Sequence, residues 1–168
     1  MNKTIIIYGS TTGTCEDLAQ RIATRLGVDK SDVINVSELT PDKVSEYDNL
    51  ILGTSTWGAG DLQDDWFDGL EILNKCNLND KKVAIFGCGD SSSYGDSFCG
   101  GMAQLWNEIK DKGAILIGQV STDGYSFDDS EAVKEGKFIG LALDEVNESD
   151  KTYTRIQNWV SELSKILG

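Results

Sequence analysis

Short apolar runs alternate along the chain with stretches in which apolar residues recur every three or four positions. The runs predict strands that are buried on both faces, at residues 4–8, 33–36, 50–53, 83–86 and 115–117. The periodic stretches predict amphipathic helices at 18–26, from the Thr40-Pro41 pair onward, at 62–73, at 102–109 and at 156–167. Gly27 stands where the first helix should stop, and Thr40 with Pro41 is typical of a helix start.

Strands that alternate with helices form βαβ units, whose right-handed crossovers build a parallel sheet covered on both sides. We therefore predict an α/β fold with a doubly wound, five-stranded parallel sheet and helices on both faces. The polar segment at about 120–137 has no periodic pattern, and 138–143 resume an apolar one, so an insertion should split the last strand. With a single proline and no low-complexity tract, residues 1–168 are expected to form one domain.

In open sheets of this kind, ligands bind beyond the carboxyl ends of the strands. Three loops follow strands there, at 9–15, 54–61 and 87–99. The first runs Gly9-Ser10-Thr11-Thr12-Gly13-Thr14-Cys15 and contains hydroxyls but no Lys or Arg. Its backbone N–H groups at a helix start suit a phosphate monoester, whereas a Walker A loop would need a lysine after Gly13. An ordinary strand-to-helix turn would also account for this loop.

The other two loops combine small residues with aromatic rings. The second contains Ser55, Thr56, Trp57, Gly58, Ala59, Gly60 and Asp61, so its indole could lie on a flat aromatic ligand. The third contains Gly87, Cys88, Gly89, Asp90, Tyr94, Asp96, Ser97, Phe98 and Cys99. Its start resembles G-x-G-x-x-G, but Ser92 replaces the third glycine and the loop follows the fourth strand, which makes a dinucleotide site a weak reading. A core tryptophan and an exposed tyrosine are the simpler alternatives.

Charge narrows the possible partners. There are 15 basic and 28 acidic residues, which gives a net charge of −13. Nucleic acid and anionic membranes would be repelled, so a basic partner surface is expected, although acidity could serve solubility alone. No apolar run approaches the roughly 18 residues of a membrane span, and the start of the chain does not read as a signal peptide. We expect a cytoplasmic protein.

Histidine is absent, which excludes Ser-His and Cys-His catalysis and His-bound metals. The four cysteines have no C-x-x-C spacing, so we expect free thiols and no metal site. Cys15 and Cys99 lie near predicted helix starts, where a thiol pKa can fall, or else they are small buried apolar residues. Chemistry would then come from a bound cofactor.

Together, the phosphate loop and the two aromatic loops resemble the flavodoxin family over essentially the whole chain, and the insertion resembles that of its long-chain type. The resemblance implies a sheet of order 2-1-3-4-5 with one non-covalent flavin mononucleotide (FMN) at its carboxyl edge. It implies a low-potential one-electron carrier, not an enzyme, and a monomer. Ferredoxin–NADP reductase-like and pyruvate oxidoreductase-like enzymes with basic docking faces are the implied partners.

The resemblance also implies roles for single residues. Ser10 to Cys15 would bind the FMN phosphate, Trp57 and Tyr94 would enclose the ring, and Asp90 would accept the ring's imide N–H. The carbonyl of Gly58 would turn toward the flavin after one-electron reduction. The full cofactor-binding set is Ser10, Thr11, Thr12, Gly13, Thr14, Cys15, Ser55, Thr56, Trp57, Gly58, Ala59, Gly60, Cys88, Gly89, Asp90, Tyr94, Asp96, Ser97, Phe98 and Cys99.

Two positions depart from the family pattern. Cys15 stands where the phosphate loop usually ends in threonine, and Val146 stands where many long-chain members place an acidic side chain against the ribityl chain. Acidic side chains near the ring should lower the flavin potential, with Asp61, Asp64, Asp65 and Asp96 as candidates.

Two other functions fit this sequence less well. A response-regulator receiver would need acidic residues after the first strand, an aspartate after the third and a lysine after the fifth, where this chain has Gly9-Ser10, Thr54-Ser55 and Gly118-Gln119. An FMN-dependent oxidoreductase such as a small quinone reductase would need an open pocket over the ring, which two covering aromatics would close.

Overall fold

The computed structural model describes residues 3–10, 13–57, 61–93, 95 and 97–167, without the side chains of Trp57 and Asp61. Its central sheet is parallel and has the order β2-β1-β3-β5, with both β6 and β10 on the outer side of β5. The strands are β1 (Thr4–Gly9), β2 (Val33–Asn35), β3 (Asn49–Trp57), β5 (Lys82–Cys88), β6 (Ile115–Ile117) and β10 (Leu141–Leu143). With β5 as the fourth strand and β6 plus β10 as the fifth, the predicted order 2-1-3-4-5 is confirmed.

The fifth strand is split, as predicted. β6 pairs with the first half of β5, at Lys82 to Ala84, and β10 pairs with the second half, at Phe86 to Cys88. The backbone comes very close where the chain rejoins the sheet, because a Cβ on Gly140 would lie 1.9 Å from the carbonyl oxygen of Ile85. Only glycine allows that approach.

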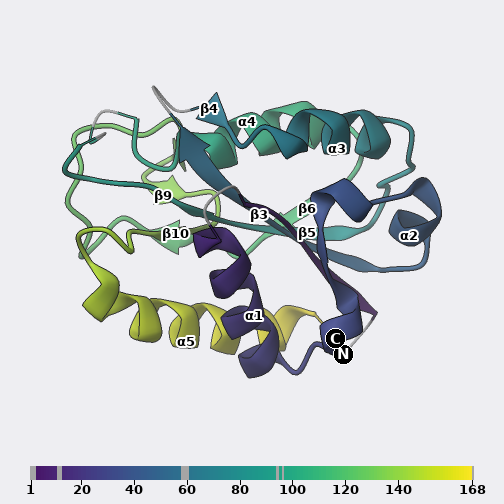
Figure 1. Cartoon of the computed structure of the whole chain (residues 1–168), viewed down its shortest axis with the longest axis horizontal. Coiled ribbons are helices and arrows are strands. Elements are labelled where there is room, and N and C mark those ends of the chain that lie inside the picture. Colours follow the sequence, from purple (N-terminus) through teal and green to yellow (C-terminus); the bar gives the residue numbers. More distant parts are fainter. Residues whose placement is uncertain (1–2, 11–12, 58–60, 94, 96, 168) are drawn as a thin grey trace.

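Helices cover both faces of the sheet (Figure 1). α1 (Thr14–Leu26) and α5 (Ser149–Ile166) lie on one face, and α2 (Pro41–Ser45), α3 (Asp65–Asn74) and α4 (Gly100–Ile109) lie on the other. Two short 3-10 helices, η1 (Lys30–Asp32) and η2 (Val36–Glu38), flank β2. Successive residues of β1 pack on opposite faces of the sheet. Ile5 and Ile7 pack under α3 and α4, whereas Ile6 packs under α1 and α5, so the sheet has a core on each face.

The predicted helix boundaries hold at two sites. Gly27 ends α1 in the left-handed conformation, at φ +81°, and its N–H donates to the carbonyl of Ala23 at 2.9 Å. The hydroxyl of Thr40 accepts from the N–H of Lys43 at 3.3 Å, with Pro41 in the first turn of α2. In the helix predicted at 156–167, the apolar pattern is wrong at one position, because Ile166 is 39% exposed while Leu167 is buried.

The third helix begins later than its apolar pattern predicts. Leu62 belongs to β4 (Asp61–Leu62), which pairs antiparallel with the end of β3, and α3 starts only at Asp65. Leu62 is only 2% exposed. In the sequence, this buried strand residue therefore extends the apolar pattern of the helix that follows it. Trp66 and Leu70, two apolar residues of this pattern, are buried.

The insertion is more ordered than its polar sequence predicts. β7 (Val120–Ser121), β9 (Lys137–Phe138) and β8 (Val133–Lys134) form a small antiparallel sheet in that order. Tyr125, Phe127 and Phe138 from this region pack with Phe98, and the Phe98–Phe127 ring centroids are 5.7 Å apart. A few aromatic residues therefore order a segment whose average composition is polar. Within the described part of the chain, no helix combines the length and apolarity needed to cross a membrane.

Candidate cofactor-binding site

The three loops leave the sheet from neighbouring strands. Gly9 pairs with Thr54 at the ends of β1 and β3, and Ser55 pairs with Cys88 at the ends of β3 and β5. Leu143, at the end of β10, also pairs with Cys88. The loops after β1, β3, β5 and β10 therefore start along one edge of the sheet, as the topology predicts.

The first loop leads into the start of α1, where backbone N–H groups lack a side-chain cap from the described residues. Gly13 adopts φ +91°, which glycine tolerates, and its N–H donates to the hydroxyl of Ser10 at 3.1 Å. No side chain of the described residues caps the start of α1, so the N–H groups of Thr14, Cys15 and Glu16 have no such partner. Thr11 and Thr12 lie outside the described residues. This helix start can accept an anion through neutral donors and the helix dipole.

Cys15 points into the core. Its side chain is 1% exposed and packs with Cys88 in the cluster under α1 and α5. Contact with the thiol of Cys88, together with burial, raises the pKa of Cys15 well above its usual value. The lowered thiol pKa considered from sequence is therefore wrong for Cys15, because burial opposes formation of a thiolate. Only the backbone of Cys15 is left to contact a ligand.

Tyr8 lies close to the same loop and is also buried. Its hydroxyl donates to Glu16 Oε1 at 3.1 Å. Burial, and then this hydrogen bond, raises the pKa of Tyr8 to about 12. The phenol therefore stays neutral and ties the end of β1 to the first turn of α1.

The second loop starts later than expected, because Ser55, Thr56 and Trp57 still belong to β3. The hydroxyl of Thr56 accepts from the N–H of Gly101 at 3.1 Å. A Cβ on Gly101 would lie 3.0 Å from the carbonyl oxygen of Ser55, so glycine lets the start of α4 approach β3. The side chain of Trp57 and all of Gly58, Ala59 and Gly60 lie outside the described residues.

The third loop is organised around Asp90. Its Oδ1 accepts from the N–H groups of Ser92 and Ser93, at 3.1 and 3.0 Å, and from Asn147 Nδ2 at 2.7 Å. The backbone of Ser93 and then Asn147 lower the pKa of Asp90 by stabilising its carboxylate. Asp90 is therefore ionised and its orientation is fixed. Tyr94 and Asp96 lie outside the described residues.

Asp144 and Asn147 hold this loop from the end of β10, and sequence analysis did not single them out. Asp144 is fully buried and accepts from the N–H and hydroxyl of Ser91 and from the N–H of Asn147. The signal in the sequence was an aspartate directly after the apolar run 141–143, at a strand's carboxyl end. Val146, by contrast, is 70% exposed.

The end of the third loop is buried. Phe98 and Cys99 are at most 1% exposed and belong to the core under α3 and α4, while Cys88 lies in the core on the other face. Burial raises the pKa of Cys99 well above its usual value, so the lowered pKa considered for this thiol is also wrong. The hydroxyl of Ser97 is buried and has no hydrogen-bond partner among the described residues.

The insertion supports the third loop from behind. The N–H groups of Asp128 and Asp129 donate to the carbonyl of Gly95 at 2.7 and 2.9 Å, and the N–H of Phe98 donates to Asp129 at 3.3 Å. The hydroxyl of Ser130 donates to the carbonyl of Phe98. The loop is thus held by the insertion on one side and by β10 on the other.

As a whole, this edge offers neutral backbone donors, hydroxyls and one fixed carboxylate. Such a set can bind an uncharged polar ring and a phosphate monoester. Within the described ranges, no group of three Cys, Asp or Glu side chains is placed to hold a metal ion.

Comparison with known proteins gives a consistent result. The flavodoxin family model matches residues 6–159. The chain is 42% identical to a flavodoxin of Synechocystis over 99% of both chains, and 39% identical to flavodoxin 1 of Azotobacter vinelandii over 98% of this chain and 97% of that one.

Among solved structures, a Fusobacterium nucleatum flavodoxin bound to flavin mononucleotide has a TM-score of 0.92 and 33% identity, with full coverage of both chains. Oxidised flavodoxin 1 of Bacillus cereus has a TM-score of 0.71 and 26% identity over 99% of both chains. The family match and the two full-length relatives establish that this chain belongs to the flavodoxin family.

Proposed function

We propose that this protein binds one FMN at the carboxyl edge of the sheet and passes single electrons between redox enzymes. The observation that carries the proposal is the start of α1, where no side chain of the described residues caps the helix and neutral donors lie beside the ends of β3 and β5. The Fusobacterium relative that matches the whole chain is itself bound to FMN. In this proposal residues 1–168 form one FMN-binding domain that acts in the cytoplasm.

The described residues fit this cofactor. The loop from Ser10 to Cys15 lacks a lysine or arginine, which suits a terminal phosphate monoester and not a triphosphate. Gly13 turns the chain so that the first N–H groups of α1 point out of the helix start. The buried hydroxyl of Ser97 lacks a protein partner among the described residues, so a ligand group at this edge can satisfy it.

Ring binding is assigned to the second and third loops. We place the flavin ring between Trp57 and Tyr94, with amides of 58–60 and 88–90 near its polar edge. Asp90, whose Oδ1 is held by Ser92, Ser93 and Asn147, would accept the ring's imide N–H. Bound FMN supplies one-electron redox chemistry, while the protein orients it, covers its faces and leaves an edge for electron exchange.

Acidity should make the carrier a strong reductant. The chain has a net charge of −13, and Asp64 and Asp65 lie at the start of α3, directly after β4 at the ligand-binding edge. Negative charge near a flavin disfavours the anion that full reduction creates, which lowers its potential. The same charge favours partners with basic docking faces, such as ferredoxin–NADP reductase-like and pyruvate oxidoreductase-like enzymes.

The test is an absorption spectrum of the purified protein during stepwise reduction. The expected result is one FMN per chain and two separate one-electron steps. A colourless protein that does not take up added FMN would overturn the proposal. Quinone reduction by a pyridine nucleotide without added reductase would instead favour an FMN-dependent oxidoreductase.

Substitution of Trp57 tests whether its indole contacts the flavin ring. Trp57→Ala should weaken FMN binding by about 1–3 kcal/mol, the range found for stacking of planar bases on aromatic side chains. Phe67→Ala is the matched control, because Phe67 is 55% exposed on α3 outside the three loops. Equal FMN dissociation constants for Trp57→Ala and the control would remove Trp57 from the site.

A further inference from the structure

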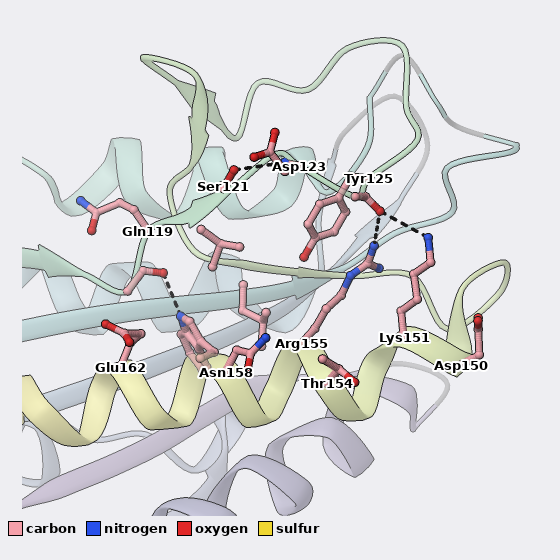
Figure 2. A pocket seen from close by; sticks show the side chains of 15 residues that line it. Gln119, Ser121, Asp123, Tyr125, Asp150, Lys151, Thr154, Arg155, Asn158 and Glu162 are labelled. Carbon is pink, nitrogen blue, oxygen red and sulfur yellow. Dashed lines mark hydrogen bonds between the residues drawn. The ribbon is translucent and has the colours of Figure 1, made fainter.

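Gln119 lines two hollows of the surface, and neither contains a residue of the three loops at the proposed FMN site. The first lies between α5 and the segment 118–125 (Figure 2). The second, which we call the hairpin groove, is lined by Trp106 of α4, Leu116 of β6 and residues of 134–139 in and after the β8–β9 hairpin. Its volume is about 500 Å³, which suits a small molecule.

The hairpin places two lysines directly opposite each other. Its turn consists of Glu135 and Gly136, whose φ values of +53° and +81° are those of a tight type I′ turn. Lys134 pairs with Lys137 across this turn, so their side chains leave the same face of the hairpin. Like charges directly opposite each other destabilise a strand pair. A negatively charged group between the two ammonium groups would offset that repulsion.

No carboxylate of the described residues forms an ion pair with Lys134 or Lys137. With Glu135 in the turn, the charge of the lining is 2 − 1 = +1, although the whole chain carries −13. The first hollow differs, because its lining includes the carboxylates of Asp123, Asp150 and Glu162. The hairpin groove is therefore a locally basic surface on an acidic protein, and it favours an anion.

The rest of the lining offers flat apolar surface. Trp106 and Leu116 are half-buried, and Ile139 beside them is 3% exposed. The indole N–H groups of Trp66 and Trp159 each donate to a backbone carbonyl at 2.8 Å. That of Trp106 has no partner among the described residues and is accessible to solvent. An aromatic ring can pack on such a surface.

We propose that the hairpin groove binds a small, flat aromatic carboxylate. The two carboxylate oxygens accept from the ammonium groups of Lys134 and Lys137, and the ring packs on Trp106 and Leu116. A single negative charge matches the +1 of the lining, whereas a doubly charged phosphate monoester would also meet the −13 of the whole chain. Nothing in this assignment depends on FMN, because the groove shares no residue with the three loops.

Three probes with the same ring test the proposal: indole-3-acetate, its neutral amide and the cation tryptamine. The readout is the indole N–H resonance of Trp106 in ¹H–¹⁵N NMR spectra, assigned with Trp106→Phe, on protein loaded with one equivalent of FMN. Indole-3-acetate is expected to shift this resonance saturably, with a Kd of about 1 mM or tighter. The amide should bind at least about threefold more weakly, because it lacks the charge.

Tryptamine should bind at this position more weakly than the amide, although the net charge of the protein favours a cation elsewhere on the surface. The absence of a saturable shift at Trp106 with indole-3-acetate overturns the proposal. Binding of the amide or of tryptamine as tight as that of indole-3-acetate also overturns it. Because the shift is read at Trp106, these outcomes are independent of whether the three loops bind FMN.

Exposed lysines allow a matched pair of variants that does not endanger the fold. Lys134→Gln combined with Lys137→Gln should weaken indole-3-acetate binding at least about threefold and change amide binding by less than about twofold. Lys30→Gln combined with Lys75→Gln is the control, since it changes the net charge equally at two exposed positions outside the groove. An unchanged indole-3-acetate Kd in the first variant, or an equal loss in both, overturns the assignment.

Discussion

Three of the four cysteines, Cys15, Cys88 and Cys99, lie under the loops at the carboxyl edge of the sheet, and none is more than 8% exposed. Burial contributes to raising the pKa of Cys15 and of Cys99, so neither forms a thiolate readily. Cys76 lies elsewhere, at the end of α3, and is only partly buried. Burial raises the pKa of Cys76 above its usual value, and nearby Lys112 and Lys81 oppose only part of this shift. Cys15, Cys88 and Cys99 therefore serve packing at the edge of the sheet.

Thiol labelling checks this difference between the cysteines. At about pH 8 a disulfide reagent should modify one thiol of the folded protein quickly, and Cys76→Ser should abolish that fast phase. Unfolding in denaturant should release all four thiols. Fast modification of two or more thiols in the folded state would contradict the burial of Cys15, Cys88 and Cys99.

At the scale of elements, the insertion and the third loop act as one unit. Ser130 joins them, because its hydroxyl donates to the carbonyl of Phe98 and accepts from the N–H of Ala132 at 3.1 Å. Ser130 is 5% exposed, so both backbone groups would be left buried and unpaired without it. The polar insertion thus helps to hold the third loop in place.

Ser130→Ala should lower the free energy of unfolding by about 1–3 kcal/mol, the cost of leaving such buried polar groups unpaired. Ser126→Ala is the matched control, because Ser126 is exposed in the same insertion, and it should change stability by less than about 0.5 kcal/mol. Urea unfolding of the FMN-free protein measures both. Equal effects of the two substitutions would mean that the Ser130 hydrogen bonds carry no stability.

Much of the fold could be predicted, because each strand of the central sheet is a continuous apolar run between helical patterns. The split fifth strand was also visible, since 115–117 and 138–143 share that apolar character. The small strands were missed because β4, β7, β8 and β9 are two residues long, too short for any period to appear. Asp144 and Asn147 were missed because their roles arise from contacts with Asp90 and Ser91, more than fifty positions away.

Glu148, just before α5, is paired with two cations of that helix, which also donate to the carbonyl of Gly124 in the insertion. Its carboxylate meets Lys151 at 2.6 Å and Arg155 at 3.2 Å, and only 12% of the side chain is exposed. Hydrogen bonds from Lys151 and then Arg155 lower the pKa of Glu148 below its usual value. A depressed carboxyl pKa stabilises the fold above the pKa of the unfolded chain and loses this effect as pH falls through the folded value.

Glu148→Gln should therefore cost about 1–2 kcal/mol of stability near pH 7, and the difference from the unchanged protein should shrink as pH falls below about 4.5. Chemical unfolding at a series of pH values measures this difference. Glu162→Gln is the control, because Glu162 and its partner Lys165 are both more than 65% exposed. A difference that does not depend on pH would show that the Glu148 charge is not the cause.

At the scale of the whole molecule, the net charge of −13 has two opposite consequences. Repulsion among the carboxylates destabilises the compact state, so salt should stabilise the folded protein. Attraction to a basic redox partner speeds their encounter, so salt should slow electron transfer. Salt concentration thus separates the effect of the charge on folding stability from its effect on docking.

The docking role should depend on where the carboxylates lie. Acidic residues at the start of α3 follow β4 and so lie at the ligand-binding edge, while others precede β3 and β6 and so lie at the opposite edge. Two triple variants with the same change in net charge compare the edges: Asp64→Asn, Asp65→Asn and Asp68→Asn against Glu46→Gln, Asp48→Asn and Asp111→Asn. All six residues are exposed.

Stopped-flow reduction of the FMN-loaded protein by a ferredoxin–NADP reductase measures the effect. The α3 variant should react at least about threefold more slowly at low salt and lose part of its salt dependence, whereas the opposite-edge variant should stay close to the unchanged protein. Both variants should gain thermal stability alike, because self-repulsion depends on total charge. If the two variants slow the reaction equally, the partner responds to net charge alone and does not dock at the edge of the sheet where the cofactor is proposed to bind.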